Sequence, residues 1–186
     1  MPTDPVGHSL VGRRVLIIGG ARSGKSAHAE ELLRDEPYVD YVATAIHDAA
    51  DAEWAERIAR HRERRPQHWN TVETADLSEV LGVDGPAALV DSITAWLTAV
   101  IDRTGAWVDE PGPRDALAQE VDRTVGAWAS TPRRVIAVTD EVGSGIVPDN
   151  PSARLFRDAL GLLNQRLAAS ADEAWLVTAG IPLRLR

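Results

Sequence analysis

The feature that most constrains the fold is a glycine-rich segment, Gly-Gly-Ala-Arg-Ser-Gly-Lys-Ser, at residues 19–26. It follows an apolar run at residues 15–18 and precedes a stretch with a helical pattern at residues 27–34. A strand, a glycine-rich turn and a helix in this order form the context of the phosphate-binding loop G-x-x-x-x-G-K-[ST]. A β–α turn that binds nothing is the alternative, and the flanking strand and helix favour the phosphate-binding interpretation.

The chemistry of phosphate binding explains each residue type in this segment. Gly19 and Gly24 allow a tight turn in which successive N–H groups point toward a phosphate. The following helix adds the positive end of its dipole. Lys25 can reach the β- and γ-phosphates, and Ser26 can ligate Mg²⁺. The sequence therefore predicts a binding site for a nucleoside triphosphate.

Composition excludes several other classes of function. The 186 residues contain no cysteine, which excludes disulfides, thiolate metal sites and cysteine nucleophiles. The formal net charge of −8 argues against non-specific binding of nucleic acid, and no apolar stretch approaches the length of a membrane span. We expect a cytoplasmic protein without stable membrane insertion, in which residues 1–12 form a flexible tail before a single domain at residues 13–186.

Strand-like and helical patterns alternate along the chain. The strand-like runs are almost continuously apolar, which is typical of a parallel sheet with both faces covered. We therefore expect an α/β fold with a mostly parallel sheet. A helix is predicted from Pro151, capped by Asn150, to about residue 170. Another helix is predicted only from residue 114, after a loop over residues 104–113 that is rich in glycine and proline.

Acidic residues follow two of the expected strands. Asp91 comes after Ala-Ala-Leu-Val, and Asp140 comes after Val-Ile-Ala-Val-Thr. Ligands of such sheets bind outside the carboxyl ends of the strands, and a P-loop enzyme needs an acid for its magnesium. Either aspartate fits this role. We favour Asp91 because it ends an uninterrupted apolar strand, and the other aspartate is then a cap or turn residue.

A predicted helix at residues 51–65 carries an unusual number of arginines for an acidic chain. Some can form ion pairs, since Glu53–Arg57 and Glu56–Arg60 have the favourable spacing of four. The remaining arginines have fewer local partners. A solvated helix and a cluster that faces the triphosphate are both compatible with this pattern. The arginines concerned are Arg57, Arg60, Arg62, Arg64 and Arg65.

His61 lies among these arginines. Neighbouring cations favour the neutral imidazole, which is the nucleophilic form. A structural or exposed histidine is the alternative interpretation. His28, on the helix after the phosphate-binding segment, is expected to be exposed.

The ordered motifs resemble one family over residues 14–186, nearly the whole chain. This is the bifunctional adenosylcobinamide kinase / adenosylcobinamide-phosphate guanylyltransferase family of cobalamin biosynthesis. No single P-loop would support the resemblance, and the ordered set is specific. Its segments are Gly-Gly-Ala-Arg-Ser-Gly-Lys-Ser at 19–26, Tyr-Val-Ala-Thr-Ala at 41–45, Arg-Ile-Ala-Arg-His-Arg at 57–62, Leu-Val-Asp at 89–91 and Glu-Val-Gly-Ser-Gly-Ile-Val-Pro at 141–148.

The resemblance implies two reactions. A nucleoside triphosphate, ATP or GTP, phosphorylates adenosylcobinamide, and GTP then transfers GMP to that phosphate through a GMP-histidine intermediate. It also implies a RecA-like P-loop fold, a homotrimer and His61 as the modified histidine. Ser26 and Asp91 are placed at magnesium by the motif and strand-end arguments above. The implied nucleotide contacts are Gly19, Gly20, Ala21, Arg22, Ser23, Gly24, Lys25, Ser26, Ala43, Thr44, Ala45, Arg62, Glu63, Arg64, Arg65, Glu73 and Asp91.

The chain departs from the family pattern at a few positions. An asparagine is common where Asp140 stands, so this chain places an extra negative charge near the site. Asp51-Ala52-Glu53-Trp54 stands where two adjacent acids and a methionine are common, which puts the approach of the corrinoid in doubt. Two rival functions are a P-loop kinase of another small metabolite and a nucleotide-dependent switch. Neither would need a histidine nucleophile.

Overall fold

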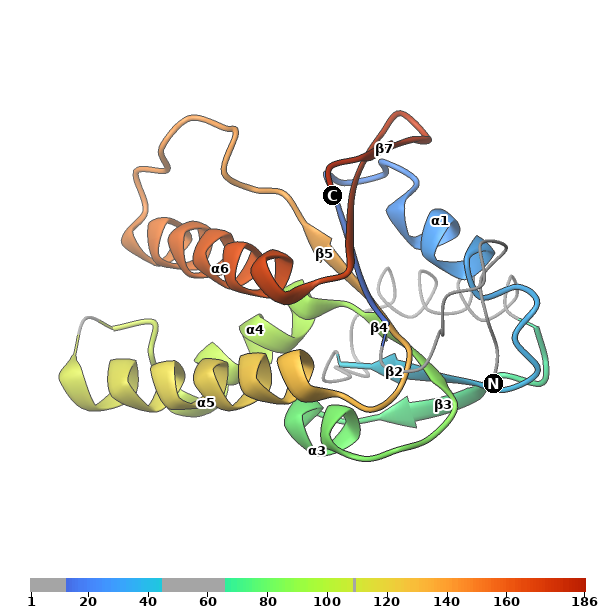
Figure 1. The fold of residues 1–186 in the computed structure, drawn as a ribbon. Coiled ribbons are helices and arrows are strands. Elements are labelled where there is room, and N and C mark those ends of the chain that lie inside the picture. The colour runs from blue at the N-terminus through green and yellow to red at the C-terminus, as the bar shows by residue number, and fades with distance from the viewer. Residues whose placement is uncertain (1–12, 45–65, 109) are drawn as a thin grey trace.

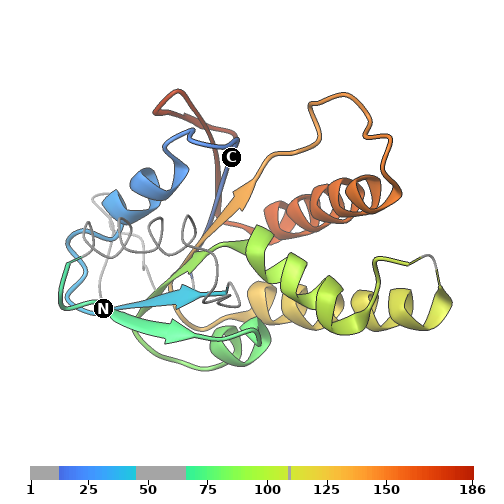
Figure 2. The same cartoon turned by 180° about the vertical axis from the view of Figure 1, so that it is seen from behind.

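A computed structural model of the protein describes residues 13–44, 66–108 and 110–186. The expected tail at residues 1–12 and the arginine-rich helix at residues 51–65 lie outside these ranges. The described strands form one seven-stranded sheet, with the helix that follows the phosphate-binding segment on one face and the helices of residues 93–104, 111–130 and 151–170 on the other (Figures 1 and 2). None of the helices in the described ranges is long and apolar enough to cross a membrane.

The sheet is parallel except at one edge, in the order β3-β2-β4-β5-β1-β6-β7. Only β7 runs antiparallel to its neighbour, β6. The α/β fold with a mostly parallel sheet is thus confirmed. The strands are β1 (Arg14–Gly19), β2 (Val39–Ala43), β3 (Asn70–Glu73), β4 (Ala87–Asp91), β5 (Val135–Asp140), β6 (Glu173–Thr178) and β7 (Ile181–Arg184). The helices are α1 (Lys25–Glu31), α3 (Leu77–Gly82), α4 (Ile93–Thr104), α5 (Pro111–Ser130) and α6 (Pro151–Ser170).

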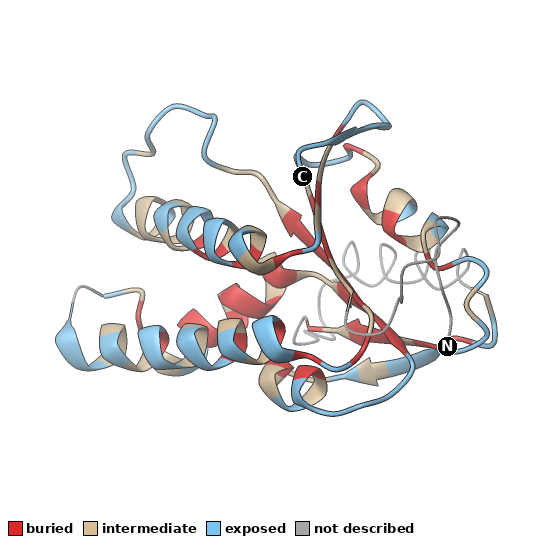
Figure 3. Ribbon diagram, viewed as in Figure 1, coloured by how far each residue is buried: buried red, intermediate tan, exposed pale blue. Residues whose placement is uncertain are grey.

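Alternate residues of the central strands feed two separate cores. On β1, Leu16 packs with the core beneath α3 to α6, whereas Val15 and Ile17 pack with the core beneath α1. All three are at most 2% exposed, because successive side chains of a strand point to opposite faces and both faces are covered. Figure 3 shows the buried residues concentrated along the sheet and on the inner sides of the helices.

The boundaries of α6 and α5 can be compared with those that the local sequence predicts. The prediction for α6 is confirmed at both ends, and the Asn150 side chain accepts hydrogen bonds from the N–H groups of Ser152 and Ala153. The predicted start of α5 at residue 114 is wrong, because the helix already begins at Pro111. Proline is tolerated in the first turn of a helix, where its missing N–H would have no partner.

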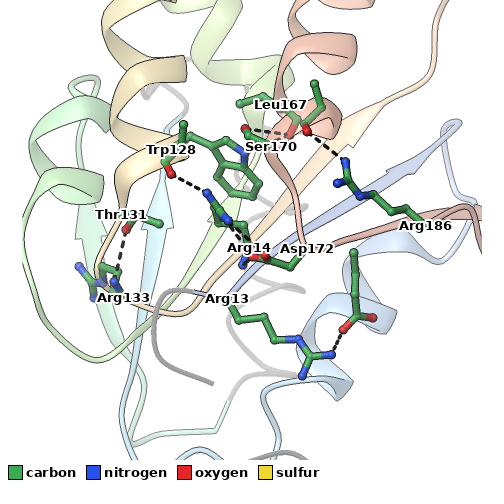
Figure 4. A network of polar contacts seen from close by, with 12 residues as sticks. Arg13, Arg14, Trp128, Thr131, Arg133, Leu167, Ser170, Asp172 and Arg186 are labelled. Atoms are coloured by element: carbon green, nitrogen blue, oxygen red, sulfur yellow. Dashed lines mark hydrogen bonds and ion pairs between the residues drawn. The ribbon is translucent and has the colours of Figure 1, made fainter. Parts of the chain in front are cut away.

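A polar network fixes the amino-terminal ends of β1 and β6, at the end of these strands that lies away from the phosphate-binding segment (Figure 4). The Arg14 backbone N–H and its Nε both donate to Asp172 Oδ2, at 2.7 and 3.0 Å, and Arg13 pairs with Glu173. Although burial of the carboxyl group opposes ionisation, the hydrogen bonds and charge of Arg14 hold the pKa of Asp172 below its ordinary value. These contacts anchor β1 at its start, at the end away from the phosphate-binding segment.

His28 on α1 is half-buried against Trp175 of β6, which corrects the expectation that it is exposed. The two rings meet edge to face, with their centroids 5.4 Å apart. Burial lowers the pKa of His28, and the nearby carboxylates of Glu173 and Glu31 offset part of this effect. The fold therefore favours the neutral imidazole.

The stability of the protein should consequently depend on the protonation of His28. In the unfolded chain a histidine takes up a proton at about pH 6.5, whereas in the folded chain it does so at lower pH. The contribution of His28 to stability is therefore fully present above about pH 6.5. It is lost as the pH falls through the window between the pKa of the unfolded chain and the lower pKa of the folded chain. We expect His28→Gln to flatten the dependence of Tm on pH between about 8 and 5. His68→Gln, at an exposed site, is the control, and equal slopes for the two variants would contradict this role of His28.

Candidate nucleotide-binding site

The phosphate-binding segment forms a tight turn between β1 and α1. Gly24 has a φ of 95°, in the left-handed region that glycine tolerates without strain. At Gly19 a Cβ atom would lie 2.5 Å from Ser23 Oγ and 2.7 Å from the carbonyl oxygen of Val177, so no side chain fits. Both glycines of the motif are thus required by the backbone and by close packing.

The turn between β6 and β7 supports this segment from the side. The N–H of Gly180 donates to the carbonyl of Ser23 at 2.8 Å. A Cβ atom on Gly24 would lie 3.1 Å from the Cα of Gly180, so the two backbones touch. The loop is therefore held by a strand connection almost at the other end of the chain.

Lys25 begins α1 and lies at the carboxyl edge of the sheet. Its side chain is only 10% exposed, and its Nζ lies 2.6 Å from Asp140 Oδ1. The same Nζ donates to the carbonyl of Gly20 at 3.1 Å. Asp140 ends β5 and is the register partner of Gly19 on β1. In this structure the motif lysine is therefore held by an acid of the neighbouring strand.

A second group of predicted contact residues gathers at the carboxyl ends of β2, β3 and β4. Ala43 is in register with Asp91 on one side and with Glu73 on the other. Tyr41 donates its hydroxyl proton to Asp91 Oδ2 at 2.8 Å, and Thr44 Oγ1 donates to the carbonyl of Ser92 at 2.7 Å. The structure thus brings these residues together at one edge.

The two groups share this edge and are separated by β5. Because β5 lies between β1 and β4, Asp91 is two strand spacings from the phosphate-binding strand, about 10 Å. Hydroxyl and carboxylate oxygens such as those of Ser26 and Asp91 are ligands that Mg²⁺ accepts. In the part of the chain that the structure describes, no cluster of three acidic or histidine side chains would hold a metal unaided. The donor set fits a magnesium ion that is bound together with substrate phosphates.

Several predicted site residues lie outside the described ranges. They are the histidine nucleophile and the residues around the arginine cluster, namely His61, Ala45, Arg62, Glu63, Arg64 and Arg65.

Sequence reasoning missed the side chains that fix Asp140. Thr94, the second residue of α4, accepts a hydrogen bond at Oγ1 from the Asp140 N–H at 2.9 Å. Asn164 on α6 donates to the Asp140 carbonyl at 3.0 Å and accepts from Thr139 Oγ1 at 2.7 Å. A signal was present, because Asn164 interrupts the apolar face formed by Leu160, Leu163 and Leu167.

Comparison with known proteins gives consistent matches along the chain. The family model described as cobinamide kinase / cobinamide phosphate guanyltransferase matches residues 15–185. The bifunctional adenosylcobalamin biosynthesis protein CobU of Salmonella typhimurium is 42% identical over 187 residues, covering 92% of this chain and 99% of that protein. The protein of the same name in Escherichia coli is 40% identical, with 92% and 99% coverage. CobP of Pseudomonas aeruginosa is 38% identical, with 93% and 97% coverage.

Among solved structures, an ATPase from the type III secretion system of pathogenic bacteria matches with a TM-score of 0.59. The match covers 90% of this chain and 51% of that chain, at 15% sequence identity. At this identity the likeness concerns the fold alone. It agrees with a strand, phosphate-binding loop and helix set in a mostly parallel sheet.

Proposed function

This chain belongs to the cobinamide kinase / cobinamide phosphate guanyltransferase family, and we propose that it catalyses both of these reactions on adenosylcobinamide. The observation that carries the proposal is the family match over residues 15–185, combined with a phosphate-binding turn whose lysine lies at the carboxyl edge of the sheet. Fold alone would not select this function, because P-loop folds serve many activities.

In the first reaction, the hydroxyl oxygen of the aminopropanol arm attacks the γ-phosphorus of ATP or GTP. The bond between the γ-phosphorus and the bridging oxygen breaks, the nucleoside diphosphate leaves with the electron pair, and the hydroxyl proton passes to water. Lys25 and the N–H groups of residues 19–26 offset the charge that develops on the phosphate oxygens. Magnesium, when bound, neutralises further phosphate charge, and Ser26 and Asp91 are the residues that would hold it.

In the second reaction, we propose that an imidazole nitrogen of His61 attacks the α-phosphorus of GTP. The bond to the β-phosphate oxygen breaks, and pyrophosphate leaves with the electron pair. A phosphate oxygen of adenosylcobinamide phosphate then displaces the histidine and forms adenosylcobinamide-GDP. Imidazole has a lone pair available at neutral pH, and the arginines beside His61 in the sequence can offset phosphate charge.

Product analysis tests the proposal against its rivals. Adenosylcobinamide is incubated with GTP and magnesium, and the corrinoid products are separated and identified by mass spectrometry. Both adenosylcobinamide phosphate and adenosylcobinamide-GDP are expected, with pyrophosphate released in step with the latter. A phosphorylated product alone would favour a small-metabolite kinase, and no corrinoid product would favour a nucleotide-dependent switch.

The choice of Asp91 over Asp140 as the magnesium acid has its own test. Asp91→Asn should raise the magnesium concentration that gives half-maximal kinase rate by about 10–100-fold, as is typical when the support of a metal site is weakened. The folded structure should persist, because Tyr41 can also donate to the asparagine oxygen. Magnesium titrations of the initial rate measure this effect. Unchanged magnesium dependence in this variant, with a loss in Asp140→Asn, would reverse the choice.

We also propose three further properties of the enzyme. Residues 13–186 act as one catalytic unit, the enzyme is a homotrimer, and it works in the cytoplasm. The family resemblance supports the second of these, and the absence of cysteine fits the third. The apolar side chains of Ile181 and Leu183 on edge strand β7 are exposed. We propose that they contact a second copy of the chain in the homotrimer.

A further inference from the structure

The lysine of the phosphate-binding segment is already paired with an anion. Lys25 Nζ lies 2.6 Å from Asp140 Oδ1, a distance typical of a close charge-assisted contact. Both side chains are largely shielded, with 10% and 27% exposed. A phosphate that takes Lys25 must therefore compete with this carboxylate.

The backbone of Asp140 is held on both sides. Its N–H is held by Thr94 of α4, and its carbonyl is held by Asn164 of α6. Its strand β5 pairs with β1 in register, so Asp140 stays opposite Gly19 at the base of the loop. Because these contacts fix the backbone, the carboxylate can only rotate about its own side-chain bonds, so its negative charge stays near the base of the phosphate-binding loop.

Other acids of this edge have different partners. Glu141 accepts hydrogen bonds from the N–H groups of Gly143 and Ser144, within its own loop. Asp91 accepts from the hydroxyl of Tyr41. Within the described ranges, the ion pair of Lys25 is with Asp140. Competition for the lysine is thus a property of this one carboxylate.

We infer that Asp140 is a specificity-determining residue, which makes the site select metal-complexed nucleotide over free nucleotide. A fixed carboxylate repels the phosphates of a free triphosphate and holds the lysine that would bind them. A divalent cation on the phosphates offsets part of their charge and reduces this repulsion. The inference rests on the proposed nucleotide site, but not on the corrinoid chemistry.

Binding of α,β-methylene GTP, which cannot donate GMP, tests the inference by calorimetry. Affinity is measured once with excess magnesium and once with EDTA, for the wild type, Asp140→Asn and Glu141→Gln. Glu141→Gln is the matched control, since it removes a neighbouring charge without touching the Lys25 ion pair. In EDTA, Asp140→Asn should bind about tenfold more tightly than the wild type, between the values for exposed and buried charge pairs. With magnesium it should bind within about threefold of the wild type. Glu141→Gln should stay within about twofold in both conditions.

Each other outcome contradicts the inference in a recognisable way. Equal preference for the metal complex in the wild type and in Asp140→Asn, with normal corrinoid products, would overturn this inference alone. Weaker binding of the magnesium complex by Asp140→Asn would make Asp140 a metal acid instead. Failure of the wild type to bind the nucleotide both with magnesium and with EDTA would overturn this inference and the proposed function together. A melting curve for each variant confirms that the folded state is being compared.

Discussion

Replacing Lys25 with alanine is expected to abolish both reactions while the chain remains folded. The two reactions share one triphosphate site, so the same ammonium group serves both. Removal of one positioned donor to a developing charge typically costs about 10²–10³-fold in rate. Here the loss is compounded, because the carboxylate of Asp140 would face the phosphates without its cation. Initial rates are measured separately, with adenosylcobinamide for the kinase step and with adenosylcobinamide phosphate for the guanylyl step.

Thermal shift provides a second readout for Lys25. Bound nucleotide stabilises the folded protein, and this stabilisation should disappear in Lys25→Ala. Arg34→Ala is a suitable control, because Arg34 follows α1 closely but is 69% exposed and pairs with Glu31. An equal rise in Tm with GTP for the wild type and Lys25→Ala would show that the assignment of the lysine is wrong.

His61→Ala is expected to remove guanylyl transfer and to spare part of the kinase activity. The first reaction transfers the γ-phosphate directly between two bound substrates and needs no nucleophile from the protein. The second needs a group that forms a covalent bond to the α-phosphorus, and alanine has none. Guanylyl transfer should therefore fall by at least about 10⁴-fold, as when a nucleophile is removed from other enzymes with covalent intermediates.

The matched control for His61 is His68→Ala. His68 is an exposed histidine a few residues farther along the chain, and no role in the site is assigned to it. Both reactions should run at wild-type rates in this variant. Equal loss of the kinase and guanylyl steps in His61→Ala would instead indicate a role in nucleotide binding that both steps share.

The parts of the fold that were predicted correctly depend on chemistry local in sequence. The phosphate-binding turn needs glycines, a lysine and a hydroxyl within eight consecutive residues, and α6 carries its own cap at Asn150. Near-continuous apolar strands identified the parallel sheet, because both faces are covered. Ala43, Glu73 and Asp91 lie side by side, since the carboxyl ends of parallel strands meet at one edge.

What could not be predicted depends on the register between distant segments. The contact between Lys25 and Asp140 exists because β5, rather than β4, pairs with β1, and no local pattern states this order. The burial of His28 arises in the same way, from the arrival of Trp175 on β6. At α5 the difference is local, because a stretch rich in glycine and proline predicts a loop, whereas Pro111 and Pro113 also suit a first helical turn.

The central claim is that one site serves both reactions and that guanylyl transfer passes through a covalent histidine. The most direct test is whether the protein retains label from GTP that is labelled at the α-phosphate. The protein is incubated with this GTP and magnesium, denatured, digested and analysed by mass spectrometry. We expect wild-type label on the peptide that contains His61, stable in base and lost in acid, as a phosphoramidate should be. His61→Ala should retain none. Label that survives acid on the wild type, or label retained by His61→Ala, would contradict the claim.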